Sequence, residues 1–224
     1  MPLVGLAPLL LALGVTCGGA ALVAPSPAPR SSGPWSYTTG DARLDARLRA
    51  EATSLARVFG VLPNLVLFED AQNPNAYASE RSTGPLSDGT VAIGLTLIAR
   101  QLGQGARGEQ AVASILAHEW SHILQIRQRC MLAGTARELH ADFLAGYYLG
   151  RRYGGVADAA VAAGRAVYQQ GDYRFGDGNH HGTPIERVQA LMQGFLHSHL
   201  SLPLAYRLGE RCALALGTSG PSAR

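Results

Sequence analysis

The chain has 224 residues, of which 47% are hydrophobic and 16% are charged. This length and composition suit one folded catalytic domain and argue against wholesale disorder. The formal net charge is only +3, and no dense basic tract occurs, so we do not expect a nucleic acid partner.

The first residues of the chain indicate export. Residues 1–24 are predicted to form a signal peptide, because a short apolar run is followed by small residues. A Pro/Ser-rich linker over 25–40 and one folded domain over 41–224 are expected to follow. The apolar run is too short for a membrane span, so we expect a periplasmic or secreted protein without an integral membrane domain after signal removal. Cys17 ends the run, and acylation there would add a lipid anchor.

Apolar residues then recur at spacings of three and four, which predicts a helix from about Asp41 to Phe59 that ends at Gly60. Short aliphatic runs between turn-forming residues predict strands, with a helix after the last one. The strands and this helix cover 64–68, 76–79, 90–93 and 95–102. Helical periodicity dominates from Glu109 onward. The expected fold is α+β and mainly helical, with a small mixed or antiparallel sheet.

Two histidines stand four residues apart in the helical segment that follows Glu109. His118 and His122 lie on one face of this helix, because one turn takes 3.6 residues, and both rings can reach one metal ion. Glu119 is displaced by about 100 degrees around the helix, where it can act on a water without binding the metal. Buried histidines and a buried carboxylate would be costly without a metal. The motif therefore predicts one Zn²⁺ per chain, with Glu119 as general base.

A third protein ligand is needed if one zinc position is to stay open for water. Glu138 and Asp142 offer carboxylates on one face of the next predicted helix. The residues alone leave another interpretation open. Thr135 and Glu138 have the spacing of a capping box, in which Glu138 would only satisfy the start of the helix.

These two segments together resemble the gluzincin class of zinc peptidases. Residues 118–125 read H-E-W-S-H-I-L-Q, and residues 138–142 read E-L-H-A-D. The resemblance is closest to the HtpX and prenyl-protein endoprotease family and to the bacterial neutral zinc metallopeptidases. It implies a zincin-like domain whose small sheet packs on the helix of the two histidines. It also implies that Glu138 is the third zinc ligand and that Asp142 orients a ligand histidine.

A strand motif extends the resemblance toward the N-terminus. Asn75, Ala76 and Tyr77 open a stretch similar to the N-A-F-A edge-strand motif of these families. The resemblance implies that this strand binds an extended peptide substrate through its main chain, while the residues alone also fit a plain turn and strand.

A second element lies near the C-terminus. His181 and Arg187 match the H-x-x-x-x-x-R element of the same families. Thr183, Pro184 and Glu186 favour a helix start directly after this histidine. We expect His181 at the rim of the zinc site, where it would donate a hydrogen bond to the developing oxyanion. Arg187 is expected to anchor this segment or an active-site carboxylate.

The predicted function is that of a zinc-dependent endopeptidase acting on peptides or proteins. The membrane-spanning helices of the HtpX and prenyl-protein endoprotease branch are absent, so its membrane-embedded chamber is not carried over. Two alternatives remain. A non-proteolytic zinc module would close the site with a fourth protein ligand, for which His181 is a candidate, and a zinc amidase would act on cell-wall peptides.

The other cysteines and histidines lie outside these motifs. After removal of the signal peptide, Cys130 and Cys212 form an even pair in an oxidising compartment, which predicts one disulfide, with two free thiols as the alternative. The remaining histidines are interpreted as surface or packed residues, and they are His140, His180, His197 and His199. His180 is also the alternative to its neighbour His181 as the functional histidine.

Overall fold

The computed structural model describes residues 35–83, 87–154, 161, 163–164 and 181–217. The predicted signal peptide and most of the linker lie outside the described residues, as do Cys17 and His180. Export, lipidation and the domain boundaries therefore stay predictions.

Helix α1, Ala42–Phe59, opens the folded part of the chain. It begins after Asp41, whose side chain accepts hydrogen bonds from two main-chain amides of the first turn, as a good N-cap does. It ends at Gly60, which has a positive φ of 66° that favours glycine. The predicted helix and its stop are confirmed.

A three-stranded sheet follows, and all three strands lie where the sequence predicts them. The strands are β1 (Asn64–Phe68), β2 (Ala76–Ser79) and β3 (Thr90–Gly94). Strand β3 is central, parallel to β1 and antiparallel to β2, so the sheet is mixed and β2 forms one edge. Helix α2, Leu95–Leu102, continues directly from β3.

The sheet separates two apolar layers of unequal size. On one face Leu67, Val91 and Ile93 join the main core with residues of α1 and of α3, Ala106–Arg127. On the other face Val66, Phe68 and Ala92 pack with Trp35 and Tyr77. Alternate side chains of a strand point to opposite faces, which explains this division. The expected packing of the sheet on the histidine helix is confirmed, because β2 and β3 both contact α3.

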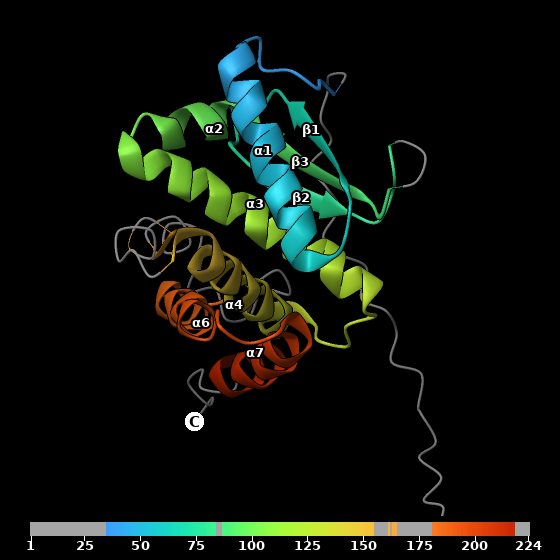
Figure 1. The fold of residues 1–224 in the computed structure, drawn as a ribbon, viewed down its shortest axis with the longest axis vertical. Coiled ribbons are helices and arrows are strands. Elements are labelled where there is room, and N and C mark those ends of the chain that lie inside the picture. Colours follow the sequence, from blue (N-terminus) through green and yellow to red (C-terminus); the bar gives the residue numbers. More distant parts are fainter. Residues whose placement is uncertain (1–34, 84–86, 155–160, 162, 165–180, 218–224) are drawn as a thin grey trace, which may run out of the picture.

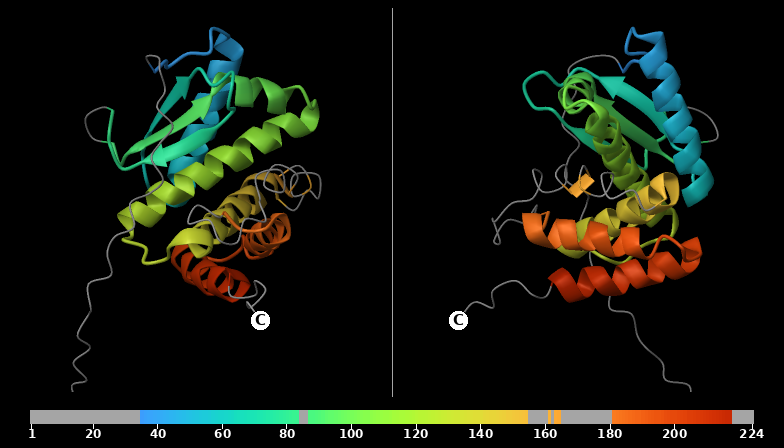
Figure 2. Two further views of the ribbon diagram at one scale, coloured as in Figure 1. Left: turned by 180° about the vertical axis from the view of Figure 1, so that it is seen from behind. Right: turned by 60° about the vertical axis from the view of Figure 1, so that its left-hand side comes forward.

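Further helices form a layer on the other side of α3 (Figures 1 and 2). They are α4 (Gly134–Tyr153), α6 (Pro184–Leu196) and α7 (Leu202–Gly217). Helices α4 and α6 approach closely at two glycines. A Cβ on Gly146 would lie 1.9 Å from the main-chain oxygen of Leu191, and one on Gly194 would lie 1.7 Å from that of Phe143. The fold is α+β and mainly helical, as predicted.

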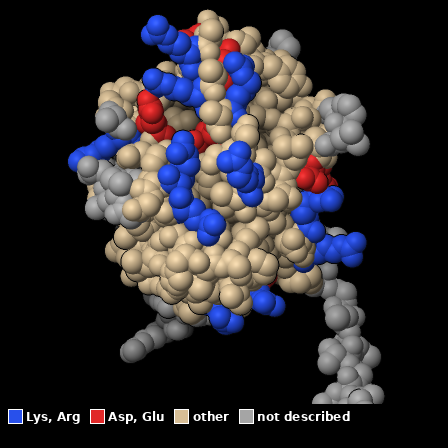
Figure 3. Space-filling view, in the orientation of Figure 1, with Lys and Arg blue, Asp and Glu red and all other residues tan. Residues whose placement is uncertain are grey.

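The surface view agrees with the modest charge. Most basic side chains on this face lie around α1, and the area over α6 and α7 is largely uncharged (Figure 3). Within the described ranges, no helix is both long and apolar enough to cross a membrane.

Cys130 and Cys212 are both free and half-buried, so this structure does not contain the predicted disulfide. An even number of cysteines does not show whether two of them lie at the distance and orientation that a disulfide requires. The Cys130 Sγ atom lies 4.0 Å from Nδ1 of His140, whereas Cys212 packs against the main apolar core. The alternative of two free thiols therefore describes this structure.

Candidate metal centre

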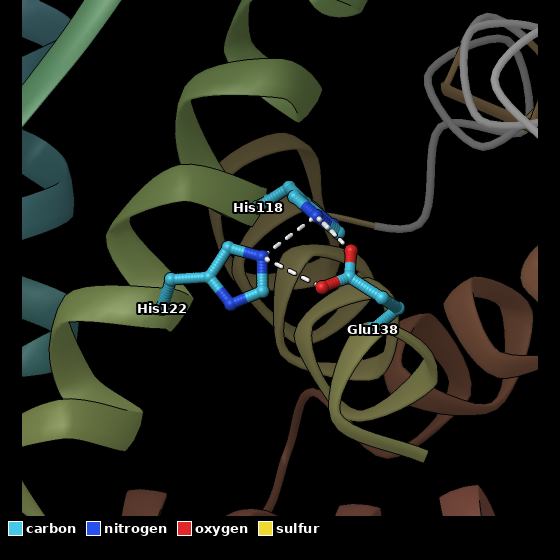
Figure 4. Close-up of side chains that lie close together, drawn as sticks. All are labelled: His118, His122 and Glu138. Carbon is cyan, nitrogen blue, oxygen red and sulfur yellow. Dashed lines mark hydrogen bonds and ion pairs between the residues drawn. The ribbon is translucent and has the colours of Figure 1, made fainter. Parts of the chain in front are cut away.

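Three potential metal ligands meet where α3 faces the start of α4 (Figure 4). His118 and His122 project from successive turns of α3, with their rings nearly perpendicular at 89°. Glu138 projects from α4 toward both rings. The two Nε2 atoms lie 3.1 Å apart, and the carboxylate oxygens of Glu138 lie 3.4 Å from Nε2 of His118 and 3.6 Å from that of His122.

These distances fit a zinc ion. Tetrahedral zinc with bonds of about 2.0–2.1 Å to nitrogen and oxygen holds its ligand atoms roughly 3.3 Å apart. The three separations found here, 3.1, 3.4 and 3.6 Å, bracket that value. Two imidazoles and one carboxylate are also a ligand set typical of hydrolytic zinc.

The second nitrogen of each ring explains why a cation is needed between them. Nδ1 of His118 lies 2.9 Å from a carboxylate oxygen of Asp142, and Nδ1 of His122 lies 2.8 Å from the amide oxygen of Gln125. Both acceptors place the ring proton on Nδ1, so both Nε2 atoms turn a lone pair toward the same point. These lone pairs would repel without a proton or a metal ion between them.

Asp142 is held in turn by Arg187 of α6. Nε of Arg187 donates to one carboxylate oxygen at 2.7 Å, and Nη2 donates to the other at 2.8 Å. Both side chains are buried, with 0% of Asp142 and 2% of Arg187 exposed. Burying one charge without the other would be costly, so the bidentate pair fixes Asp142 behind His118.

Helix α6 starts as the sequence predicts. Thr183 caps it, Pro184 occupies the first turn, and Glu186 completes a capping box with the Thr183 main chain. This rigid start places Arg187 one turn into the helix, where it reaches Asp142 of α4.

The capping interpretation of Glu138 is wrong for this structure. Helix α4 begins at Gly134, and its N-cap is Ala133, which makes no side-chain cap hydrogen bond. Thr135 is therefore already inside the helix and is not its cap. The carboxylate of Glu138 is directed instead at the two histidines.

Glu119 lies on α3 between the two histidines and is 8% exposed. Burial raises the pKa of its carboxyl above the ordinary value, and the nearby Glu138 adds to this, while His118 and His122 oppose it. A raised carboxyl pKa suits a general base that must take up a proton near neutral pH.

The charged groups of the site lower the pKa of Glu138 and raise the pKa of His118. Burial disfavours ionisation of Glu138, but His122 and His118 outweigh it and hold its pKa well below the usual range. Burial likewise disfavours the charged form of His118, but Asp142, Glu138 and Glu119 raise its pKa to about 10. In the metal-free protein His118 therefore carries a proton at neutral pH.

Zinc binding should consequently release that proton. Because the proton occupies His118 until the pH approaches about 10, the zinc Kd should weaken by about tenfold for each unit of pH decrease between pH 9 and 7. Competition with a chelator across this range measures the slope. A Kd that is constant above about pH 7.5 would show instead that the pKa of His118 is near its ordinary value.

The predicted substrate strand is an edge of the sheet. Ala76 and Tyr77 belong to β2, which contacts α3, and no described strand pairs with its outer edge. Asn75 precedes β2, and its amide donates to Asp70 at 3.0 Å. Asp70 is buried and also accepts hydrogen bonds from the amides of Thr96 and Leu97 at the start of α2. Asp70 therefore fixes the entry of the edge strand.

His181 is exposed and precedes the buried Gly182. A Cβ on Gly182 would lie 3.2 Å from Leu139 and 3.3 Å from Thr135, both in the first half of α4. Gly182 also has a positive φ of 95°, which favours glycine. The segment that carries His181 therefore lies against the turns of α4 that carry Glu138.

One comparison with known proteins adds to this geometry. Residues 42–133 match the model of peptidase family M48. The match confirms the resemblance to gluzincin-type zinc metallopeptidases and supports zinc-dependent peptidase activity in general. No curated protein and no solved structure matches the chain.

The M48 match covers the edge strand and the helix of His118, Glu119 and His122, but it ends before Glu138. The remaining site residues therefore rest on the geometry of α4 and α6.

The sequence interpretation gave no role at this site to three residues that the structure places around it. Asp70 fixes the edge strand, and Gln125 contacts His122. His140, interpreted from sequence as a surface or packed residue, is buried and contacts Gln125. Gln125 could be connected with His122 only by its spacing of three residues in a helix. The partners of Asp70 and His140 lie farther away in the sequence, so spacing gave no signal for these two residues.

Proposed function

We propose that the protein is a zinc-dependent endopeptidase that hydrolyses peptide bonds in extended peptide segments. The observation that carries this proposal is the group formed by His118, His122 and Glu138, whose ligand atoms are spaced for one zinc ion. Glu119 lies on the same helix turn and is buried beside this group. In the described part of the chain the group has three members, which leaves a zinc position for water or substrate.

The chain's own groups divide the chemistry between them. When bound, zinc would supply a Lewis acid that acidifies a water and polarises the scissile carbonyl. Glu119 takes a proton from the attacking water and passes it to the leaving amine. Asp142 and Gln125 hold the ring protons on Nδ1, so that the Nε2 atoms of both histidines bind the metal.

The edge strand β2 supports an extended peptide as substrate. Its outer edge can accept another strand through main-chain hydrogen bonds, which suits binding of many sequences. Ala76 and Ala78 pack toward the core that contains α3, and Tyr77 packs on the opposite face of the sheet. A peptide added at this edge would therefore run beside the helix that carries the two histidines.

Hydrolysis of unlabelled casein and of a peptide library tests the proposal. We expect new peptide termini from the purified protein, none after a chelator, and recovery on addition of one equivalent of zinc. A zinc-loaded protein that cleaves neither substrate would contradict the endopeptidase. Release of amino groups from cell-wall peptides alone would identify the amidase instead.

His181 provides a separate prediction. If it donates a hydrogen bond to the oxyanion, His181→Ala should lower kcat by about 10²-fold or more, with zinc retained and KM little changed. Steady-state kinetics and zinc analysis of the variant measure this, with His199→Ala as the control. An unchanged kcat together with a fall in His180→Ala would shift the role to the neighbouring histidine. Loss of zinc from His181→Ala would indicate a closed structural site.

A further inference from the structure

The structure assigns Gln125 and His140 a positioning role: together they hold the ring of His122 with its proton on Nδ1, which leaves Nε2 free to bind a metal ion. The inference rests on the proposed function only in taking His122 as a metal ligand. Neither residue is itself one of the three potential ligands, so both act through His122.

The first link lies within α3. The amide oxygen of Gln125 lies 2.8 Å from Nδ1 of His122, one helical turn away. Because an amide oxygen only accepts, this contact places the proton on Nδ1. A reversed amide would present its NH₂ group to Nδ1, and the ring proton would then move to Nε2. The orientation of the Gln125 amide therefore decides whether His122 can bind a metal.

Partners with a fixed polarity set that orientation. The Gln125 NH₂ group donates to the main-chain oxygen of Arg137 at 2.9 Å. It also lies 3.1 Å from Nδ1 of His140. A main-chain oxygen can only accept, so the NH₂ group must face it. The side chain of Arg137 adds a weaker contact, 3.4 Å from its Nε to the Gln125 oxygen.

His140 is fixed in turn by α7. Its Nε2 lies 3.1 Å from the main-chain oxygen of Tyr206, so the proton of His140 is on Nε2 and its Nδ1 accepts. The ring stands at 85° to the Tyr206 ring. A Cβ on Gly209 would lie only 2.8 Å from the imidazole, so α7 leaves the ring little room. The contacts connect Tyr206 to His140, His140 to Gln125, and Gln125 to His122, and each of these hydrogen bonds therefore has a defined donor and acceptor.

The two zinc-ligand histidines are therefore held by different means. The acceptor for His118 is the carboxylate of Asp142, whose two oxygens are chemically equivalent. The acceptor for His122 is an amide, which is not symmetric and needs a further partner to hold it the right way round. It follows that His140 matters for zinc binding only while residue 125 is an amide.

A double-mutant cycle tests this dependence. The zinc Kd is measured by chelator competition for the wild type, His140→Phe, Gln125→Leu and the double variant. We expect His140→Phe to weaken zinc binding by about tenfold or more in the wild-type background. In the Gln125→Leu background, which has no amide to orient, we expect the same substitution to change the Kd by less than about twofold.

Equal weakening in both backgrounds would show a merely structural effect and overturn the inference, as would an unchanged Kd for His140→Phe. If that variant does not fold, His140→Asn replaces it. Its amide oxygen can keep the acceptor near the place of Nδ1, so it should keep zinc binding within about threefold of the wild type. A tenfold loss in this variant would contradict the role.

The ring proton can also be located directly. In the zinc-free wild type, ¹⁵N NMR of His122 should show the proton on Nδ1, and a proton on Nε2 would overturn the inference. This readout needs no zinc. A wild type that binds no zinc but shows the Nδ1 proton would therefore refute the proposed function and leave the positioning role supported.

Discussion

Replacement of Glu119 by Gln is expected to abolish hydrolysis while one zinc ion per chain stays bound. Glu119 is buried and is not one of the three potential ligands, so its loss removes the proposed proton transfer and leaves the ligand set intact. General acid–base catalysis contributes about 10²–10⁴-fold, and we expect turnover to fall by that amount. Single-turnover kinetics with zinc analysis measures both quantities.

Glu109→Gln is the matched control, because Glu109 lies on the same helix but is 57% exposed and pairs only at the surface with Arg47. Stability gives a second readout. Burial raises the pKa of the Glu119 carboxyl above its ordinary 4.5. Its ionisation therefore destabilises the folded protein relative to the unfolded chain as the pH rises above that value. Zinc-free Glu119→Gln should therefore melt at a higher temperature than zinc-free wild type at neutral pH. Retained turnover in this variant would exclude Glu119 as the base.

Glu138→Ala is expected to lose zinc. The substitution leaves two histidines as ligands and removes the ionised carboxylate that both of them face. The loss of affinity should exceed the roughly 10–100-fold typical of residues that only support a ligand. Zinc analysis after dialysis against a chelator, and the Kd from chelator competition, measure the effect.

Glu69→Ala serves as the control for this variant, since Glu69 is an exposed carboxylate after β1. It should keep one zinc ion per chain. If Glu138→Ala kept its zinc through the same dialysis, the third ligand would have to be another residue, and the position of Glu138 on α4 would be only structural.

The elements that follow from local chemistry could be predicted from the sequence. Helix α1 with its stop at Gly60, the three strands, and the capped start of α6 all depend on neighbouring residues. The two histidines of α3 meet because four residues make about one turn. The start of α4 could not be predicted in the same way, because Thr135 and Glu138 have the spacing of a capping box whereas the helix begins after Ala133, which has no capping side chain.

Contacts between distant segments could not be derived from spacing. Arg187 lies 45 residues from Asp142, and His140 lies 66 residues from Tyr206. The role of Arg187 was anticipated only through a family resemblance. Gln125 and His140 lie within the two motif segments, but the resemblance gave neither of them a role. Their further partners are the main-chain oxygens of Arg137 and Tyr206, which carry no sequence signature. The same holds for the cysteines, whose even number predicted a bond that the fold does not form.

X-ray absorption spectroscopy of the zinc-loaded protein reports the ligands of the metal, so it distinguishes an open hydrolytic zinc site from a closed one. We expect four-coordinate zinc with two imidazoles, one carboxylate from Glu138 and one exchangeable oxygen, at about 2.0–2.1 Å. In Glu119→Gln the same spectrum is expected. A third imidazole, a sulfur ligand, or no exchangeable oxygen would contradict an open hydrolytic site.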